Sequence, residues 1–458
     1  MKPSHIHFIA IGGAAMHALA IALKNKGYRV TGSDDEIFEP SRSRLMDHGL
    51  LPDKPGWFPE KITAGIDAVI LGMHAHKDNP ELTQALNMGI KVFSYPEYVT
   101  EQTRHKNRVV IAGSHGKTTI TSMIMHVLKF NNVIFDYLVG SHIQGFDNMV
   151  NLDDKAAIAV FEGDEYLASA LDQRPKFHVY QPHVALVSGI AWDHVNVFPT
   201  YEQYKKQFAI FINNLPDDGL LVYYDEDNEL KRMVEQSTTG ARKIPYNAHI
   251  CEVEDEKTYL RVGDKKLQLE IFGKHNLQNI SGARIVCEKL GISGDRFYNA
   301  ITSFKGAGKR LQVLTKNPET VVFLDFAHSP SKVKATIEAV KEQFPGRKLV
   351  ACLELHTYSS LTKSFLVNYA MTMEHADEAI VFYNPDTIAH KRLEMITPLE
   401  IKGAFNKDKL LVYTSSQEMK EHLYCLSWKK AVLLIMSSGN FSGIDFRELA
   451  EQITGKID

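Results

Sequence analysis

Short apolar runs recur along the whole chain and alternate with longer segments whose apolar positions repeat every three or four residues. Runs such as RVVIA and VVFLD are typical of buried strands, because each is short, continuous and rich in β-branched residues. The segment TITSMIMHVL, which follows the first of these runs closely, has the spacing of a helix. Strands that alternate with helices in this way predict an α/β fold with mostly parallel sheets.

The pattern divides into three blocks, which we expect to be three domains with boundaries good to a few residues. The first block, residues 1–105, runs from HIHFIAIGG to KVFSYP. The second, residues 106–308, begins at RVVIAGSHGKTT and ends in the Gly- and Lys-rich FKGAGKR. The third, residues 309–458, contains five apolar runs separated by helical patterns and predicts a further doubly wound sheet.

Composition narrows the class of protein. The 458 residues carry a net charge of -3, so no electrostatic footprint for nucleic acid or for an anionic membrane is expected. The four cysteines are far apart and form no CxxC pair, which argues against a zinc site and fits a reducing cytosol. The apolar stretch near the N-terminus resembles a signal peptide, but its histidines and glycines fit a strand, a turn and a helix better.

A glycine turn, IAIGGAAMHA, follows the first strand and opens the first helix. Asp34 stands at the end of the next strand, about 20 residues on, as in a dinucleotide-binding fingerprint. The fingerprint is imperfect, because Ala10, Gly12 and Ala15 occupy its three glycine positions. Gly12 and Gly13 still allow backbone N–H groups to approach a pyrophosphate. Three interpretations stay open: a nicotinamide dinucleotide, another nucleotide diphosphate, or a turn without a ligand.

The stretch GSHGKTT, residues 113–119, lies between a strand and a helix and looks like a shortened phosphate-binding loop. The common spacing would put a first glycine where Ile111 stands. Lys117 is expected to contact the β- and γ-phosphates, and the Thr118 hydroxyl to bind Mg²⁺. The alternative is a glycine-rich turn without a ligand.

Acidic residues at neighbouring strand ends are candidates for the metal. Glu162 directly follows the run AAIAVF, and Asp193 and His194 follow HVALVSGI. Ligands gather beyond the carboxyl ends of parallel strands, so both positions suit a metal site. Asp164 and Glu165 come next after Glu162, and for them capping of a helix N-terminus is an equal alternative.

Two later segments carry further candidates. HNLQN places His275, Asn276 and Asn279 near one face of a helix start, where amides suit an adenine edge and capping by Asn276 is the alternative. Arg310 lies at the junction with the third block, where it would complete a phosphate site on domain closure. LDFAHSP ends a strand with Asp325 and His328.

Taken in order, IGGAAM, GSHGKTT, EGDE, WDH, HNLQN, GKR and DFAHSP resemble the Mur ligase family over nearly the whole chain. The resemblance implies a Rossmann-like N-terminal domain, a central P-loop ATPase domain with a mostly parallel sheet, and a Rossmann-like C-terminal α/β domain. It implies ATP and Mg²⁺ as cofactors. The partners implied are UDP-N-acetylmuramate and a small amine or peptide, in the cytoplasm of a bacterium, with the protein a monomer or dimer.

The resemblance also assigns roles. The catalytic residues implied are Lys117, Glu162, His194 and Arg310, and the metal ligands Thr118, Glu162 and His194. The ATP contacts implied are Gly113, Ser114, His115, Gly116, Lys117, Thr118, Thr119, Asn276, Asn279, Arg310 and Asp325. The UDP-muramoyl contacts implied are Gly12, Gly13, Ala14, Ala15, Met16, Ser33, Asp34 and His74. The amine-side residues are His328, His356, Tyr358 and Lys363.

In this family the γ-phosphate goes to a carboxylate, and an amine then displaces phosphate from the acyl phosphate. Two branches fit: one adds L-alanine to UDP-N-acetylmuramate, and the other reattaches the tripeptide L-alanyl-γ-D-glutamyl-meso-diaminopimelate. The segment after EGDE and the C-terminal MSSGNFSGI resemble the second branch more. ELHTYSS, where the amine is expected to bind, differs from both.

Two other classes of function compete. A dehydrogenase would explain Gly12 and Asp34 but would leave GSHGKTT, EGDE and HNLQN without a role. A UDP-sugar sensor or scaffold would need a broken ATP site, whereas Lys117, Glu162 and Arg310 are all present. Both are therefore weaker interpretations than the ligase.

Overall fold

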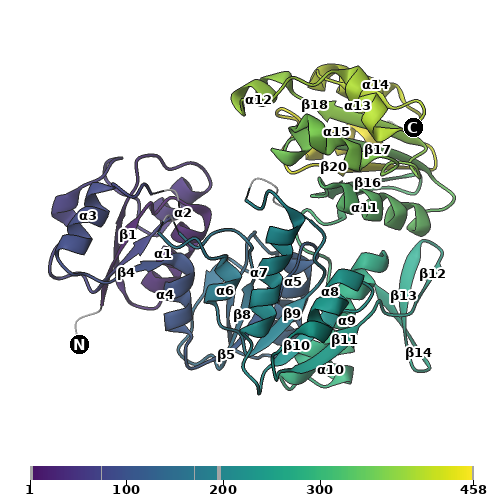
Figure 1. Cartoon of the computed structure of the whole chain (residues 1–458). Coiled ribbons are helices and arrows are strands. Elements are labelled where there is room, and N and C mark those ends of the chain that lie inside the picture. The colour runs from purple at the N-terminus through teal and green to yellow at the C-terminus, as the bar shows by residue number, and fades with distance from the viewer. Residues whose placement is uncertain (1–3, 74, 170, 193–196, 456–458) are drawn as a thin grey trace. The chain divides into compact units, whose positions relative to one another are not determined.

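A computed structural model describes residues 4–73, 75–169, 171–192 and 197–455 of the chain. The predicted α/β class is confirmed, because each of the three blocks contributes its own parallel-rich sheet (Figure 1). Backbone contacts divide the chain into two compact units, one of residues 1–191, 202–247 and 282–300, the other of residues 192–201, 248–281 and 301–458. The predicted boundaries at residues 105 and 308 stay predictions.

The N-terminal sheet has the strand order β2-β1-β3-β4, and its neighbours pair in parallel. Its strands are β1 (His5–Ile9), β2 (Arg29–Ser33), β3 (Ala68–Leu71) and β4 (Val92–Ser94). The helices are α1 (Ala14–Asn25), α2 (Ser41–Asp47), α3 (Pro80–Asn87) and α4 (Tyr95–Gln102), with a short 3-10 turn, η1 (Pro59–Lys61). The apolar N-terminal stretch is therefore β1, a glycine turn and α1.

The central sheet has the order β11-β10-β9-β5-β8-β6-β7 and is parallel except for β7. Its strands are β5 (Asn107–Ala112), β6 (Phe135–Leu138), β7 (Val150–Asn151), β8 (Ile158–Glu162), β9 (Val184–Val187), β10 (Leu220–Tyr224) and β11 (Arg242–Tyr246). Its helices are α5 (Lys117–Phe130), α6 (Lys176–Val179), α7 (Tyr201–Asn213), α8 (Asn228–Gln236), α9 (Lys274–Lys289) and α10 (Gly294–Ile301). Because β5 lies between β8 and β9, the ends of these three strands meet.

A small antiparallel sheet precedes α9, and the sequence pattern did not predict it. It consists of β12 (Cys251–Glu254), β13 (Lys257–Val262) and β14 (Lys265–Leu269). It is bonded to the C-terminal domain of its own unit, since Thr258 donates to the Gln343 amide at 2.7 Å. Arg347 donates two hydrogen bonds to the Glu256 carboxylate, at 2.6 and 2.8 Å. This sheet is therefore part of the unit that holds the third domain.

The C-terminal sheet has the order β15-β16-β20-β17-β18-β19 and is parallel except for β15. Its strands are β15 (Gln312–Lys316), β16 (Thr320–Asp325), β17 (Lys348–Leu355), β18 (Glu378–Tyr383), β19 (Leu411–Tyr413) and β20 (Ala431–Met436). The helices are α11 (Pro330–Gln343), α12 (Pro385–His390), α13 (Pro398–Phe405), α14 (Ser416–Cys425) and α15 (Phe446–Gly455), with 3-10 turns η2 (Ser359–Leu361) and η3 (Lys363–Tyr369).

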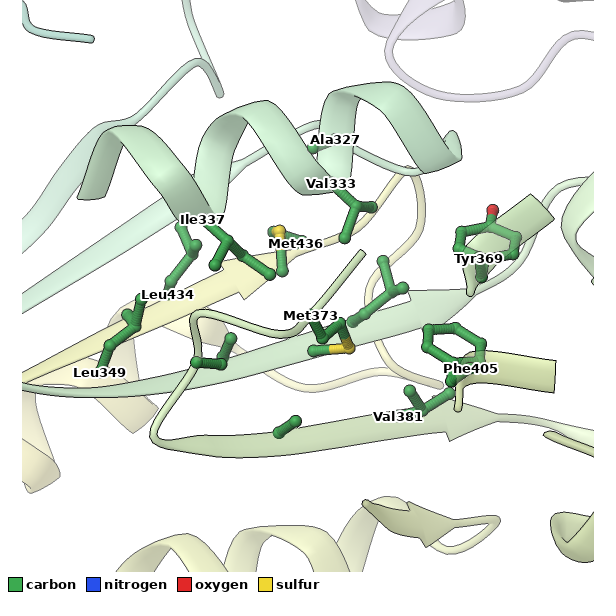
Figure 2. Close-up of a cluster of buried hydrophobic side chains, with 14 of the residues drawn as sticks. Ala327, Val333, Ile337, Leu349, Tyr369, Met373, Val381, Phe405, Leu434 and Met436 are labelled. Carbon is green, nitrogen blue, oxygen red and sulfur yellow. The ribbon is translucent and has the colours of Figure 1, made fainter. Parts of the chain in front are cut away.

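Alternate residues of the C-terminal strands enter two separate cores, as expected for a sheet covered on both faces. Figure 2 shows the core under α11, where Val333 and Ile337 lie over Leu349, Leu434 and Met436. On the other face, Val350, Cys352 and Leu433 join residues of α14 and α15. Burial on both faces fixes the strand register, so the residues that follow each strand emerge at one edge.

Within the described ranges, none of the helices combines the length and apolar character needed to cross a bilayer. The four cysteines are free thiols.

We predict that Phe405→Ala destabilises the C-terminal domain by about 3–5 kcal/mol. Phe405 is fully buried at the end of α13, and its ring stacks on Tyr369 with centroids 5.0 Å apart. Leu399→Ala on the same helix is the matched control, because Leu399 is 79% exposed and should change stability by less than about 0.5 kcal/mol. Denaturant unfolding measures both. Equal effects of the two variants would contradict this account of the core.

Candidate active site

The phosphate-binding loop is held in place by the strands on either side of β5. Ser114 donates its backbone N–H to Gly189 O at 2.9 Å, and Gly163 N–H bonds to Ile111 O at 2.8 Å. Gly113 and Gly116 have φ of 125° and 79°, a region that other residues rarely enter. A Cβ at residue 113 would lie 2.4 Å from the Ser188 hydroxyl oxygen. The loop therefore needs glycine at both positions, and α5 begins at Lys117.

Thr118 and Glu162, the two described residues predicted to bind the metal, lie next to each other. The Thr118 hydroxyl donates to Glu162 Oε1 at 2.7 Å, and Gly140 N–H donates to Oε2 at 2.9 Å. A hydroxyl and a carboxylate are oxygen donors of the kind that Mg²⁺ takes, the remaining places being filled by phosphate and water. This donor pair fits Mg²⁺. Among the described residues, no group of three or more His, Cys, Asp or Glu side chains is arranged to hold a metal, here or at another place.

Lys117 is engaged by a partner that the sequence analysis did not assign to it. Its Nζ lies 2.9 Å from both carboxylate oxygens of Glu165 and 2.6 Å from Gly113 O. Glu165 is fully buried and also accepts a bond from the Tyr204 hydroxyl at 3.2 Å. Burial by itself would lower the pKa of Lys117, but the carboxylates around it, Glu165 first and then Asp164 and Glu162, together outweigh burial and raise the pKa. Lys117 is therefore a cation held ready at the loop.

Asp164, the acid next to Glu165, binds a different lysine. Its carboxylate binds Lys176 Nζ at 2.7 Å and the Tyr166 N–H at 3.2 Å. Burial alone would raise the pKa of Asp164, and the nearby Lys176 and Lys117 more than offset it, so the pKa is lowered. In this described stretch the next helix, α6, begins at Lys176, so Asp164 and Glu165 do not cap a helix. The three acids of EGDE thus have separate partners: Glu162 binds Thr118, Asp164 binds Lys176 and Glu165 binds Lys117.

The N-terminal glycine turn keeps the geometry of the fingerprint despite its alanine. Ala10 has φ of 66°, so the first position adopts the left-handed conformation that glycine usually provides. Asp34 accepts the Gly12 N–H at 2.7 Å. Burial raises the Asp34 pKa to about 6, although the Gly12 bond opposes this. Gly13 stands at the N-cap of α1, Ala14, Ala15 and Met16 are the first residues of that helix, and Ser33 ends β2. His74 lies outside the described residues.

Several other predicted ATP residues lie in the second unit. Asp325 accepts backbone N–H groups of Leu311 and Ala327, both at 2.7 Å, and so fixes the chain beside Arg310. The Arg310 guanidinium lies 5.0 Å from the Phe326 ring centre. Asn276 and Asn279 are buried near the start of α9, and Asn276 donates to Phe272 O at 2.8 Å. Because the Asn276 amide already bonds the Phe272 carbonyl, its assignment to adenine stays a prediction.

The amine-side candidates lie at the carboxyl edge of the third sheet or just beyond it. His328 follows β16, and its ring Nδ1 lies 2.8 Å from Phe326 O. His356 and Tyr358 follow β17. The His356 side chain is 41% exposed, and Tyr358 as a whole residue is 49% exposed. Lys363 pairs with Glu394 at 3.0 Å and Glu400 at 2.6 Å, beside a surface cavity of about 320 Å³. His194, the remaining predicted metal ligand, lies outside the described residues.

Comparison with known proteins places this geometry in a family. Three family models match in order: "Mur ligase family, catalytic domain" over residues 5–107, "Mur ligase middle domain" over 111–287 and "Mur ligase, glutamate ligase domain" over 309–439. A UDP-N-acetylmuramate–L-alanine ligase of Caldicellulosiruptor bescii is 30% identical over 395 residues, 82% of each chain.

Two further likenesses span almost the full length. The UDP-N-acetylmuramate–L-alanyl-γ-D-glutamyl-meso-2,6-diaminoheptandioate ligase of Haemophilus influenzae is 26% identical over 454 residues, covering 96% of this chain and 97% of its own. The crystal structure of the UDP-N-acetylmuramate–alanine ligase of Thermotoga maritima, 20% identical, has a TM-score of 0.70 and covers 98% of both chains. This chain belongs to the Mur ligase family and is an ATP-dependent ligase that forms an amide bond in peptidoglycan metabolism.

Proposed function

We propose that the protein joins the tripeptide L-alanyl-γ-D-glutamyl-meso-diaminopimelate to UDP-N-acetylmuramate in the bacterial cytoplasm, as a step of peptidoglycan recycling. One observation carries the choice of branch: the likeness to the Haemophilus influenzae ligase, which acts on that peptide by its name, extends over nearly the entire chain. The sequences after Glu162 and at MSSGNFSGI support the same choice.

L-alanine is the second candidate for the amine. It is favoured by relatives named UDP-N-acetylmuramate–L-alanine ligase, which are 28–30% identical over 78–88% of this chain. These identities are slightly higher than that of the tripeptide ligase, but the matches are shorter. The two amines therefore need a direct comparison.

The central domain would carry out the first half of the reaction. Lys117 lies at the start of α5, where the phosphates of ATP would meet both its ammonium group and the backbone N–H groups of the loop. Mg²⁺ held by Thr118, Glu162 and His194 would neutralise charge on the transferring phosphoryl group. Arg310 would add a further cation. Together these groups favour transfer of the γ-phosphoryl group to the carboxylate of UDP-N-acetylmuramate, which gives an acyl phosphate.

The outer domains would hold the two other substrates. The glycine turn at Gly12 and Gly13 would bind the pyrophosphate of UDP-N-acetylmuramate, although the Gly12 N–H would first have to leave the Asp34 carboxylate that it binds here. Ser33, Asp34 and His74 would contribute to the same substrate site. His328, His356, Tyr358 and Lys363 would bind the amine substrate. Because Lys363 already pairs with two glutamates, a substrate carboxylate would have to compete with them.

We predict that the tripeptide is a much better substrate than free L-alanine, judged by kcat/KM. Remote contacts to a peptide's carboxylates can be used to position its amine, and L-alanine lacks those groups. The measurement supplies both amines at equal concentration with ATP and UDP-N-acetylmuramate and quantifies the two products. Equal incorporation of L-alanine would assign the protein to the biosynthetic branch.

We predict that Glu165→Gln tightens ATP binding, by roughly fivefold, because the γ-phosphate no longer competes with a carboxylate for Lys117. The amide keeps the shape of the side chain but removes its charge. Asp172→Asn is the matched control, since Asp172 pairs with Arg174 on the same segment and should leave ATP affinity unchanged. Calorimetric titration with a non-hydrolysable ATP analogue measures each variant. Weaker binding in Glu165→Gln would show that Glu165 aligns Lys117 and does not compete for it.

A further inference from the structure

A buried carboxylate stands at the carboxyl end of β17, and none of the steps above uses it. Glu354 is 3% exposed. Its Oε2 accepts a bond from the Ser437 hydroxyl, which follows the neighbouring strand β20, and a second from the Phe441 N–H at 3.0 Å. A carboxylate in such a place is costly unless its charge serves an interaction. The second oxygen, Oε1, shows what that interaction is.

The Oε1 atom of Glu354 faces His356. The two residues are separated by one position along the extended chain, so their side chains leave it on the same side. The distance from His356 Nδ1 to Glu354 Oε1 is 3.7 Å, slightly longer than a hydrogen bond. Bonds of this kind are often long before substrate binds. The buried carboxylate thus lies behind a ring whose other edge is accessible, since the His356 side chain is 41% exposed.

The loop after β20 closes over this pair. A Cβ at Gly439 would lie 2.8 Å from Glu354 Oε2 and 3.0 Å from the His356 ring, so the backbone passes directly against both side chains. Gly439 N–H donates to the Ser437 oxygen at 2.7 Å. The segment MSSGNFSGI therefore shapes the walls of the Glu354–His356 pair.

We propose that Glu354 is a positioning residue that holds His356 as the proton acceptor for the incoming amine. This inference rests on the proposed function, in which an amine attacks an acyl phosphate. An amine arrives mostly as its ammonium ion, which has no lone pair, so a proton must leave before the attack. With Nδ1–H directed at Glu354, the Nε2 atom of a neutral His356 carries the lone pair that takes this proton.

His356 Nε2 takes one proton from the ammonium group and becomes imidazolium, which the Glu354 carboxylate stabilises. The nitrogen lone pair forms the C–N bond, and the C–O bond to the phosphoryl group breaks, so that phosphate leaves with the electron pair. The second nitrogen proton passes to the departing phosphate or to water.

Lys363, the cation predicted for the amine side of this domain, has its own partners. It is paired with Glu394 and Glu400. The segments packed on the pair contribute Ser437, Gly439 and Phe441, which do not titrate in the physiological range. Glu354 is thus the carboxylate that the described residues place within 4 Å of the His356 ring.

The domain also offers a matched control. Glu378 is the first residue of β18, so it lies at the amino-terminal edge of the parallel strands, opposite the edge where Glu354 lies. Its Oε1 lies 2.7 Å from His422 Nε2. It too is a glutamate–histidine pair, but it lies away from the predicted amine site. Glu378→Gln should therefore leave both halves of the reaction unchanged.

Hydroxylamine separates acyl phosphate formation from proton removal, because it is small and already neutral at pH 7. The full-length protein is given ATP and UDP-N-acetylmuramate, with hydroxylamine in one arm and the tripeptide or L-alanine in the other. We expect His356→Ala to lower amide formation by roughly 100-fold and to leave hydroxamate formation within about twofold of wild type. Glu354→Gln should lower amide formation on the order of tenfold, because its NH₂ group would face Nδ1 and favour the tautomer that cannot accept a proton at Nε2.

The pH dependence gives a second readout. Below the pKa of a peptide amine, about 8, the remaining activity of His356→Ala should rise nearly tenfold per pH unit, since it depends on free amine in solution. A parallel loss of hydroxamate and amide, or an unchanged ratio of the two in both variants, would overturn the inference. If the wild-type protein forms no hydroxamate from UDP-N-acetylmuramate, the proposed function itself fails, and the inference with it.

Discussion

The carboxyl ends of parallel strands meet at one edge of a sheet, and this constraint places the side chains on which the chemistry depends. In the central domain β5 lies between β8 and β9, so the loop after β5 is bonded to the chain on both sides. The same edge receives Glu162, because β8 ends at that residue. In the third domain it brings together Glu354, next to the last residue of β17, and Ser437 after β20. Both sites follow from strand order.

Two fully or nearly fully buried glutamates then set the behaviour of the residues beside them. Glu165 holds the ammonium group of Lys117, and Glu354 lies behind His356. A buried carboxylate is stable only with partners, so each must keep a cation or several N–H and O–H donors. Glu165 satisfies this with Lys117 and Tyr204, and Glu354 with Ser437 and the Phe441 N–H. Their charge is therefore available in fixed positions, which is what a catalytic site requires.

Much of this arrangement could be predicted from the sequence. The motif GSHGKTT between a strand and a helix predicts a phosphate-binding loop, and its glycines at residues 113 and 116 adopt the positive φ that such a loop requires. Glu162 could be predicted beside Thr118 since it directly follows an apolar run, and it proves to be the last residue of β8. The parallel-rich sheets follow from the alternation of apolar runs with helical patterns.

Other features depend on contacts between distant segments, which periodicity does not encode. The partner of Lys117 is Glu165, and helix capping was an equally good interpretation until the following segment proved to be irregular. Glu354 reads as one polar residue in an apolar strand, and its role appears only with Ser437 beside it. Ala10 departs from the glycine fingerprint yet adopts φ of 66°, because the turn around it imposes that conformation. The strands of the small sheet β12–β14 are short and mix charged with apolar residues, so they show no clear strand periodicity in the sequence.

In the proposed reaction, the γ-phosphate of ATP activates the carboxylate of UDP-N-acetylmuramate. The most direct test uses UDP-N-acetylmuramate with ¹⁸O in both carboxylate oxygens, together with ATP and the tripeptide. The account predicts that each inorganic phosphate released carries one ¹⁸O atom, because the C–O bond of the acyl phosphate breaks when the amine attacks. Phosphate without ¹⁸O, formed alongside the amide product, would contradict an acyl phosphate and with it the proposed roles of Lys117, Thr118 and Glu162.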